Sequence, residues 1–230
     1  LSVIQYILPV VLCILYSREH RDNANLSKIK KFTSHLRNSA LELMSDADKF
    51  SKTSMSKTKE KLHRMRFELG KSAIVPVPDI TYNPESLSHT ICSIHTARNK
   101  QMLAFAGKPA TSILSTYPCF ITNASYFEES NHIVIPWGIL QWPFYHKDAP
   151  LGWNHGGIGA TICHEMVHAF DLEGSKYSPR GAYKEIWTRR DKRKFKSQTR
   201  KLSKFFSKFK HFGKKVDGQR TLSENWADLG

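Results

Sequence analysis

Residues 161–170 read TICHEMVHAF, in which two histidines stand four positions apart and a glutamate follows the first. Residues four apart lie on one face of an α-helix, with Cβ atoms roughly 5–6 Å from each other. His164 and His168 can therefore reach one small cation, and imidazole is a ligand that suits zinc. Glu165 lies one position round the helix, where a carboxylate can act as general base on a zinc-bound water. The alternative is two histidines that only share a helix face.

A third ligand is expected from another element, and the sequence SENWADLG at residues 223–230 offers one. A catalytic zinc commonly takes three protein ligands and keeps a fourth position open. Glu224 and Asp228 share a helix face, so Glu224 can complete a His-His-Glu set while Asp228 hydrogen-bonds the outer nitrogen of a ligand histidine. Asp171 can hold a histidine in the same way. The alternative is that carboxylates near a helix start only favour the helix dipole.

The composition is ordinary for a globular protein except for its charge. Of the 230 residues, 40% are hydrophobic and 24% charged, and the length is enough to bury a core. Lys and Arg outnumber Asp and Glu by 35 to 20, which gives a formal net charge of +15. Such an excess indicates an anionic partner. The four cysteines form no C-x-x-C pair, so they predict no thiolate zinc ribbon and leave the disulfide pattern open.

Most of the excess charge lies in residues 184–220, which hold fifteen Lys or Arg and three acidic residues. An apolar stripe at helical spacing accompanies them: Phe195, Leu202, Phe205, Phe206, Phe209 and Phe212. One interpretation is a solvated helix whose stripe packs on the rest of the protein. The other is contact with an anionic surface, a glycosaminoglycan or a membrane. No nucleic-acid-recognition motif accompanies the stretch, which argues against a nucleic-acid partner.

The patterning predicts a mostly helical chain with a small sheet. Residues 3–16 are apolar but shorter than the roughly twenty residues of a spanning helix, so we expect a buried segment there. The expected helices cover 26–70 with a break near Asp46, then 85–106, 185–212 and 221–230. The expected strands cover 119–127 and 131–140, with a turn at 128–131. Three prolines from Pro76 onward predict a boundary between a helical segment, residues 1–75, and a catalytic core, residues 76–230.

Four motifs occur in order: NASY at 123–126, IVIPWGILQWPF at 133–144, GGIGATICHEMVHAFD at 156–171 and ENWAD at 224–228. In these the chain resembles the neprilysin and endothelin-converting-enzyme family of zinc metallopeptidases. The resemblance is strong over residues 118–230 and continues faintly back to about residue 10. It implies an α+β, mostly helical fold: a thermolysin-like zincin core with a small sheet and an HExxH helix, which we expect to be incomplete at both ends.

The resemblance also implies roles for residues of the HExxH and ENWAD motifs. One Zn²⁺ per chain would be held by His164, His168 and Glu224, with Glu165 as general base. The implied reaction is hydrolysis of small peptides on the amino side of hydrophobic residues, by a metalloendopeptidase located outside the cell, secreted or as the ectodomain of a membrane-anchored protein.

The remaining implied residues position the ligands and the substrate. Asp228, counted with the catalytic residues, and Asp171 would hold the ligand histidines. The side-chain amide of Asn123 and the carbonyl of Ala124 would bind the peptide backbone, as an edge strand does when it is lengthened by an extended peptide.

The family also has a catalytic histidine and a substrate-binding arginine beyond its ENxAD motif, whereas this chain ends at Gly230. The sequence therefore leaves two classes of function open. The first is the zinc metalloendopeptidase. The alternative is a catalytically incompetent relic or partial chain that binds peptide or anionic surfaces through the basic stretch 184–220.

Overall fold

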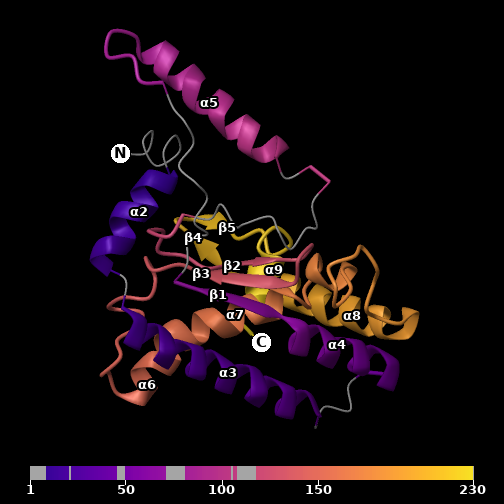
Figure 1. Ribbon diagram of the computed structural model, residues 1–230. Helices are drawn as coiled ribbons and strands as arrows, with labels where there is room; N and C mark the ends of the chain where they lie inside the picture. The colour runs from indigo at the N-terminus through magenta and orange to yellow at the C-terminus, as the bar shows by residue number, and fades with distance from the viewer. Residues whose placement is uncertain are drawn as a thin grey trace.

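The computed structural model describes residues 9–20, 22–45, 50–70, 81–104, 106–107 and 118–229 (Figure 1). The helices are α2 (Pro9–His20), α3 (Asn23–Ser45), α4 (Lys52–Arg64), α5 (Leu87–Leu103), α6 (Leu151–Asn154), α7 (Ala160–His168), α8 (Arg189–Phe206) and α9 (Leu222–Ala227). The strands are β1 (Arg66–Leu69), β2 (Ser125–Phe127), β3 (His132–Ile135), β4 (Lys210–His211) and β5 (Lys214–Lys215). The predicted mostly helical α+β class is therefore confirmed.

The larger sheet has the strand order β1-β3-β2, with β1 parallel and β2 antiparallel to β3. Its central strand is apolar and β-branched, and Ile133, Val134 and Ile135 are fully buried. β2 and β3 are shorter than the predicted strands, but the turn between them is confirmed: Asn131 has a φ of 47° and donates from its backbone to the Glu128 carbonyl. This arrangement leaves β2 at an edge of the sheet.

The prediction of one helix running to Gly70 is wrong. Helix α4 ends at Arg64, and Met65 takes an extended conformation with ψ of 127°. Residues 66–69 then pair in parallel with residues 132–135, so hydrogen bonds to a distant strand override the local helical preference. Gly70 ends the strand with a φ of 62°, and a Cβ there would lie 2.7 Å from the ring of Trp137.

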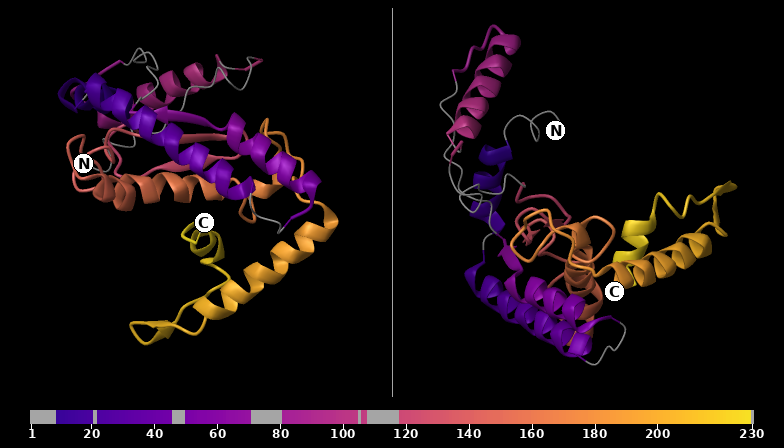
Figure 2. Two further views of the ribbon diagram at one scale, coloured as in Figure 1. Left: turned by 90° about the horizontal axis from the view of Figure 1, so that it is seen from below. Right: turned by 90° about the vertical axis from the view of Figure 1, so that its right-hand side faces the viewer.

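The predicted boundary between residues 75 and 76 lies outside the described residues. β1 comes from the first predicted segment and β3 from the second, so both segments contribute to one sheet. The same holds for the core cluster, which joins Ile29 of α3 and Leu62 of α4 to Ile162 of α7. The HExxH helix is therefore supported by helices from the first part of the chain (Figure 2).

The predicted buried segment at residues 3–16 is described from Pro9 onward. Cys13 is buried and accepts a hydrogen bond from the backbone of Cys119, 2.8 Å from nitrogen to sulfur, whereas Leu15 is 52% exposed. The segment is thus buried on one side only. No helix in the described ranges is both long enough and apolar enough to cross a membrane.

The predicted basic helix over 185–212 is shorter in the structure. α8 begins after Thr188, whose side chain accepts from the Asp191 backbone, and it ends at Phe206. The chain then forms the hairpin β4–β5, with Phe212 and Gly213 in the left-handed conformation at its turn. Of the predicted apolar stripe, Phe195 is buried and Phe206 is half-buried, whereas Phe205, Phe209 and Phe212 are exposed.

Asp191 anchors the start of α8. Its carboxylate accepts hydrogen bonds from the hydroxyls of Ser51, Ser54 and Thr188 and from the backbone of Ser51, which precedes α4. Burial alone would raise the pKa of Asp191, but these hydrogen bonds outweigh it and hold the pKa well below its usual range. This single carboxylate therefore ties the first turns of α4 and α8 together.

Candidate metal centre

The backbone just before helix α7 packs closely against the backbone of Phe144. The chain passes from α6 through a π-helical turn, residues His155–Gly159, directly into α7. Ile158 donates to the Phe144 carbonyl at 2.8 Å, and a Cβ on Gly157 would collide with that carbonyl. The glycine-rich sequence before HExxH thus permits this contact, which sets the position of the helix.

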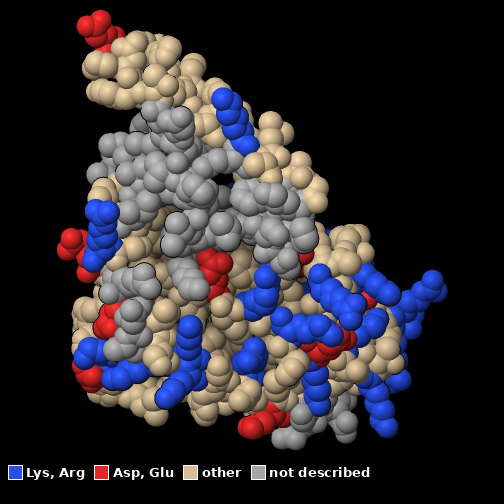
Figure 3. All heavy atoms as spheres, viewed as in Figure 1, with Lys and Arg blue, Asp and Glu red and all other residues tan. Residues whose placement is uncertain are grey.

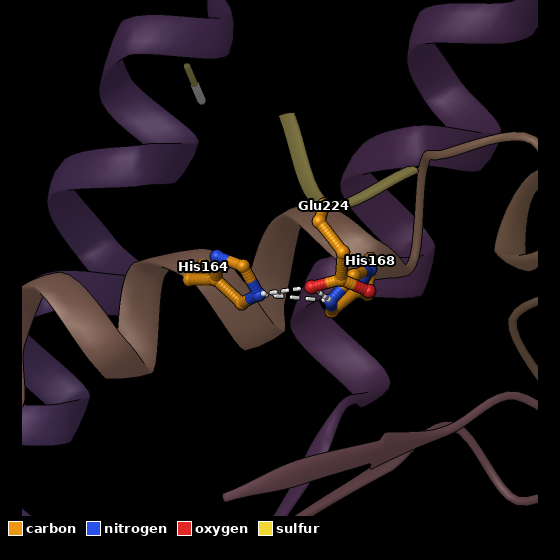
Figure 4. Close-up of side chains that lie close together, drawn as sticks. All are labelled: His164, His168 and Glu224. Carbon is orange, nitrogen blue, oxygen red and sulfur yellow. Dashed lines mark hydrogen bonds and ion pairs between the residues drawn. The ribbon is translucent and has the colours of Figure 1, made fainter. Parts of the chain in front are cut away.

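The three predicted ligands converge on one point (Figure 4). The Nε2 atoms of His164 and His168 lie 3.0 Å apart, and Oε2 of Glu224 lies 3.3 Å from the first and 3.7 Å from the second. Two ligand atoms of a tetrahedral zinc are about 3.3 Å apart, since zinc–nitrogen bonds are about 2.0–2.1 Å long. The three separations therefore match those around one zinc ion.

The outer nitrogens of both histidines face carboxylates. His164 Nδ1 lies 2.8 Å from Asp228 Oδ1, and His168 Nδ1 lies 2.8 Å from Asp171 Oδ2. Each carboxylate requires a proton on the Nδ1 that it faces, which leaves a lone pair on Nε2. Two lone pairs 3.0 Å apart beside the Glu224 carboxylate repel one another unless a proton or a metal cation lies between them. The donor set therefore fits a divalent metal, and zinc in particular.

Helix α9 carries Glu224 to the site by packing on α8. The indole of Trp226 meets the buried ring of Phe195 edge-on, with centroids 4.8 Å apart. Trp226 therefore points toward α8, while Glu224 and Asp228, four residues apart, reach the histidines. Their carboxylates are largely exposed, so the metal position opens to solvent on the α9 side.

The loop after α7 is organised around Asp171, which is buried. Oδ1 accepts from the backbones of Glu173 at 2.9 Å and Gly174 at 2.8 Å, and Oδ2 accepts from the hydroxyl of Ser223 as well as facing His168. Burial raises the pKa of Asp171, but these hydrogen bonds outweigh it and lower the pKa overall. Asp171 therefore stays ionised and keeps the ring of His168 in place.

A buried lysine of α4 supports the same loop. Lys61 is fully buried and donates from Nζ to the carbonyl oxygens of Gly174 at 2.5 Å and Tyr177 at 2.8 Å. Its Nζ also lies 5.9 Å from the ring centroid of Tyr126. Burial lowers the pKa of Lys61 to about 8, although nearby carboxylates, Asp171 first among them, oppose this.

Glu165 is buried beneath the sheet edge, with 6% of its surface exposed. Burial raises its pKa, while the imidazoles of His168 and His164 and a backbone hydrogen bond from Tyr126 act in the opposite direction. That hydrogen bond connects the carboxylate directly to strand β2. A carboxylate of raised pKa next to a metal position has the properties of a general base.

Asn123 and Ala124 lie immediately before β2, the last strand in the order of the described sheet. Asn123 is exposed and Ala124 is buried, and the Ala124 carbonyl accepts from the Ser125 hydroxyl at 2.7 Å. Both residues line a pocket of about 340 Å³ that also contains the three candidate metal ligands and Glu165. The structure thus brings every predicted site residue into or next to one pocket.

Two supporting residues were absent from the sequence-based prediction. Lys61 stands in a lysine-rich helix and is indistinguishable there from its solvated neighbours, because only the packing of α4 on the loop buries it. Ser223 directly precedes Glu224, and that adjacency was a signal that its hydroxyl would lie near the ligands.

Comparison with known proteins agrees with the family resemblance that the sequence motifs indicated. A model of peptidase family M13 matches residues 123–230. The neutral endopeptidase of Lactobacillus helveticus is 36% identical over 148 residues, which are 64% of this chain and 23% of that protein. Endothelin-converting enzyme 1 of Homo sapiens is 41% identical over 110 residues, which are 48% of this chain and 14% of that protein.

A solved structure matches over the whole chain. The zinc metalloprotease Zmp1 of Mycobacterium tuberculosis, in complex with an inhibitor, superposes with a TM-score of 0.90 at 25% identity and covers 100% of this chain and 36% of that protein. This chain therefore spans a third or less of the two relatives named above and little more than a third of this one. The ordered motifs, the convergent ligands and these matches place residues 123–230 of this chain in peptidase family M13, the family of neprilysin and the endothelin-converting enzymes.

Proposed function

We propose that this chain is part of a zinc-dependent metalloendopeptidase that hydrolyses small peptides. One observation carries the proposal: the three ligand atoms of His164, His168 and Glu224 converge beside the buried carboxylate of Glu165. A single zinc ion per chain at this point would lower the pKa of a coordinated water and polarise the scissile carbonyl.

The chain's own residues then have separate tasks. Glu165 accepts the proton of the attacking water and transfers it to the leaving amine, which its raised pKa favours. Asp228 and Asp171 keep the two imidazoles oriented through their Nδ1 atoms. The turn held by Asp171 and Lys61 keeps His168 fixed while substrate binds.

A peptide would bind in extended form along β2. Among the described residues this strand pairs with β3, and several of its residues border the pocket. The Asn123 amide and the second lone pair of the Ala124 carbonyl would hydrogen-bond the peptide backbone, which is how an edge strand recruits a peptide independently of its side chains.

The preference for cleavage on the amino side of hydrophobic residues rests on the family resemblance. The residues that line the pocket are mainly polar and acidic, and besides the two imidazoles Tyr126 contributes an aromatic ring. The described lining residues therefore do not form a hydrophobic subsite. The resemblance also supports the proposed extracellular location.

The test is hydrolysis of an internally quenched peptide by the chain loaded with zinc. Glu165→Gln removes the base but no metal ligand, so we expect zinc content to stay at one per chain while turnover falls by a factor of a hundred or more, the scale of general-base catalysis. Glu128→Gln, which changes another carboxylate that lines the same pocket, is the control and should keep the turnover of the parent. Equal turnover by the parent and Glu165→Gln would overturn the proposal.

A further inference from the structure

The end of α8 and the hairpin β4–β5, residues 201–215, form a surface that the peptidase reaction does not use; we call it the basic tip. In both views of Figure 2 it projects away from the larger sheet and from α7. It combines two features that seldom occur together on a protein surface that faces water: a dense positive charge and exposed phenylalanine rings.

The charge of this region has one sign. Residues 192–216 contain eleven Lys or Arg and no Asp or Glu. The Lys residues of the basic tip are exposed, and none of them forms an ion pair with any residue in the described ranges. In Figure 3, blue side chains gather at the right of the molecule, where α8 lies, with a few red ones among them. Such a surface attracts a polyanion over a distance of about a Debye length.

The aromatic residues of the tip are clustered and exposed. Phe205 is 52%, Phe209 49% and Phe212 92% exposed, and the rings of Phe205 and Phe209 meet edge-on at 5.2 Å. Phe212 stands at the hairpin turn with a φ of 45°, a conformation that Gly or Asn adopts far more readily than a bulky residue. The turn therefore presents a large apolar ring to solvent at a position where the backbone favours a small polar residue.

From these features we propose that the basic tip docks on the surface of an anionic phospholipid bilayer. Phe212, Phe209 and Phe205 would enter the boundary between headgroups and acyl chains, while the flanking lysines contact the anionic headgroups. A sulfated polysaccharide or a double-stranded nucleic acid would engage the lysines but would leave these rings in water, and the sequence carries no motif typical of proteins that bind single-stranded nucleic acid. The lipid surface is the polyanion that accounts for both features.

The docking is independent of the peptidase reaction. The hairpin lies at the end of α8 farthest from the first turn that Asp191 anchors, and the pocket residues are contributed by β2, α7 and α9. The protein can therefore be tested for membrane binding with or without zinc. Failure of one proposal leaves the other untouched.

The test is co-sedimentation of the full chain with vesicles of phosphatidylcholine, with and without phosphatidylserine. We expect binding only with phosphatidylserine, weakening as salt rises. Each lysine near the surface contributes about fivefold to partitioning, so the double variant Lys214→Glu, Lys215→Glu should bind at least about 25-fold more weakly. The double variant Lys30→Glu, Lys31→Glu on α3 changes the net charge equally at another exposed site and should retain most of the binding.

The contribution of the phenylalanine rings to membrane binding is tested with separate variants. Phe212→Ser should lower partitioning about tenfold and leave the thermal unfolding curve unchanged, whereas Leu87→Ser, at a similarly exposed apolar residue of α5, should change neither. In Phe212→Trp, the added fluorescence should be quenched by brominated lipid. Absence of binding to either vesicle, equal losses in both lysine double variants, or binding to soluble heparin without vesicle binding would each overturn the proposal.

Discussion

Lys61 of α4 donates a hydrogen bond from Nζ to the carbonyl oxygen of Gly174, and the backbone N–H of Gly174 donates to Asp171, which faces His168. A helix more than a hundred residues earlier in the chain thereby supports a candidate metal ligand. The ammonium group achieves this although it is fully buried, and its lowered pKa reflects the cost of that burial.

This cost leads to a prediction about pH. Lys61 has a pKa of about 8 in the folded protein and 10.5 ordinarily, so between these values the unfolded state binds more protons and folding stability rises with pH. Methionine does not titrate. The free energy of unfolding of the parent minus that of Lys61→Met should therefore increase by about 1.5 kcal/mol from pH 8 to pH 9.5. Urea unfolding at several pH values measures it.

The exposed lysine Lys52 at the start of the same helix provides the control. Lys52→Met should show a difference from the parent that hardly depends on pH in this range. A pH-independent difference for Lys61→Met would mean that the ammonium group is not buried as the structure shows.

The ligand set predicts zinc stoichiometry. The parent should hold one zinc per chain, and Glu224→Ala and His168→Ala should each weaken zinc binding by more than a hundredfold, since a lost ligand costs more than a lost outer hydrogen bond. Competition with a chelator measures the affinity. Glu173→Ala removes an exposed carboxylate that lines the same pocket and should bind zinc as the parent does. One zinc retained at parent affinity in Glu224→Ala would refute the His-His-Glu assignment.

The two carboxylates that hold the histidines should differ from each other. Asp228→Asn and Asp171→Asn should both weaken zinc binding by about 10–100-fold, because each imidazole loses the group that orients it. Only Asp171→Asn should also destabilise the metal-free protein, by about 1–3 kcal/mol, since Asp171 accepts from Glu173, Gly174 and Ser223 as well. Equal stability of the two metal-free variants would contradict the structural role of Asp171.

The buried carboxylate at the start of α8 should be important for stability. Asp191→Ala leaves three hydroxyl groups without their acceptor and should cost about 3 kcal/mol. Because hydrogen bonds lower the pKa of Asp191, its contribution is complete above its ordinary pKa of 3.8 and is lost as pH falls further. Denaturant unfolding of Asp191→Ala beside Glu42→Ala, an exposed carboxylate on α3, checks this. A loss no larger than that of Glu42→Ala would show that the cluster contributes little.

The sequence by itself was sufficient to predict which side chains converge at the candidate metal centre. The spacing of His164 and His168, and of Glu224 and Asp228, is a property of one helical turn and needs no knowledge of the rest of the fold. The motif order then indicated the family, and the class of fold followed. The turn at residues 128–131 was equally local and was predicted correctly, although the left-handed conformation of Asn131 is known only from the structure.

What only the tertiary structure decided depends on contacts between distant segments. Residues 66–69 have a helical pattern, yet they form a strand because β3 offers hydrogen bonds that the local sequence does not encode. Lys61 is buried only because α4 packs on the loop after α7. The basic helix ends at Phe206 because the chain turns into a hairpin that exposes Phe212. Local periodicity determines which face a residue occupies, whereas burial and strand pairing depend on what packs against that face.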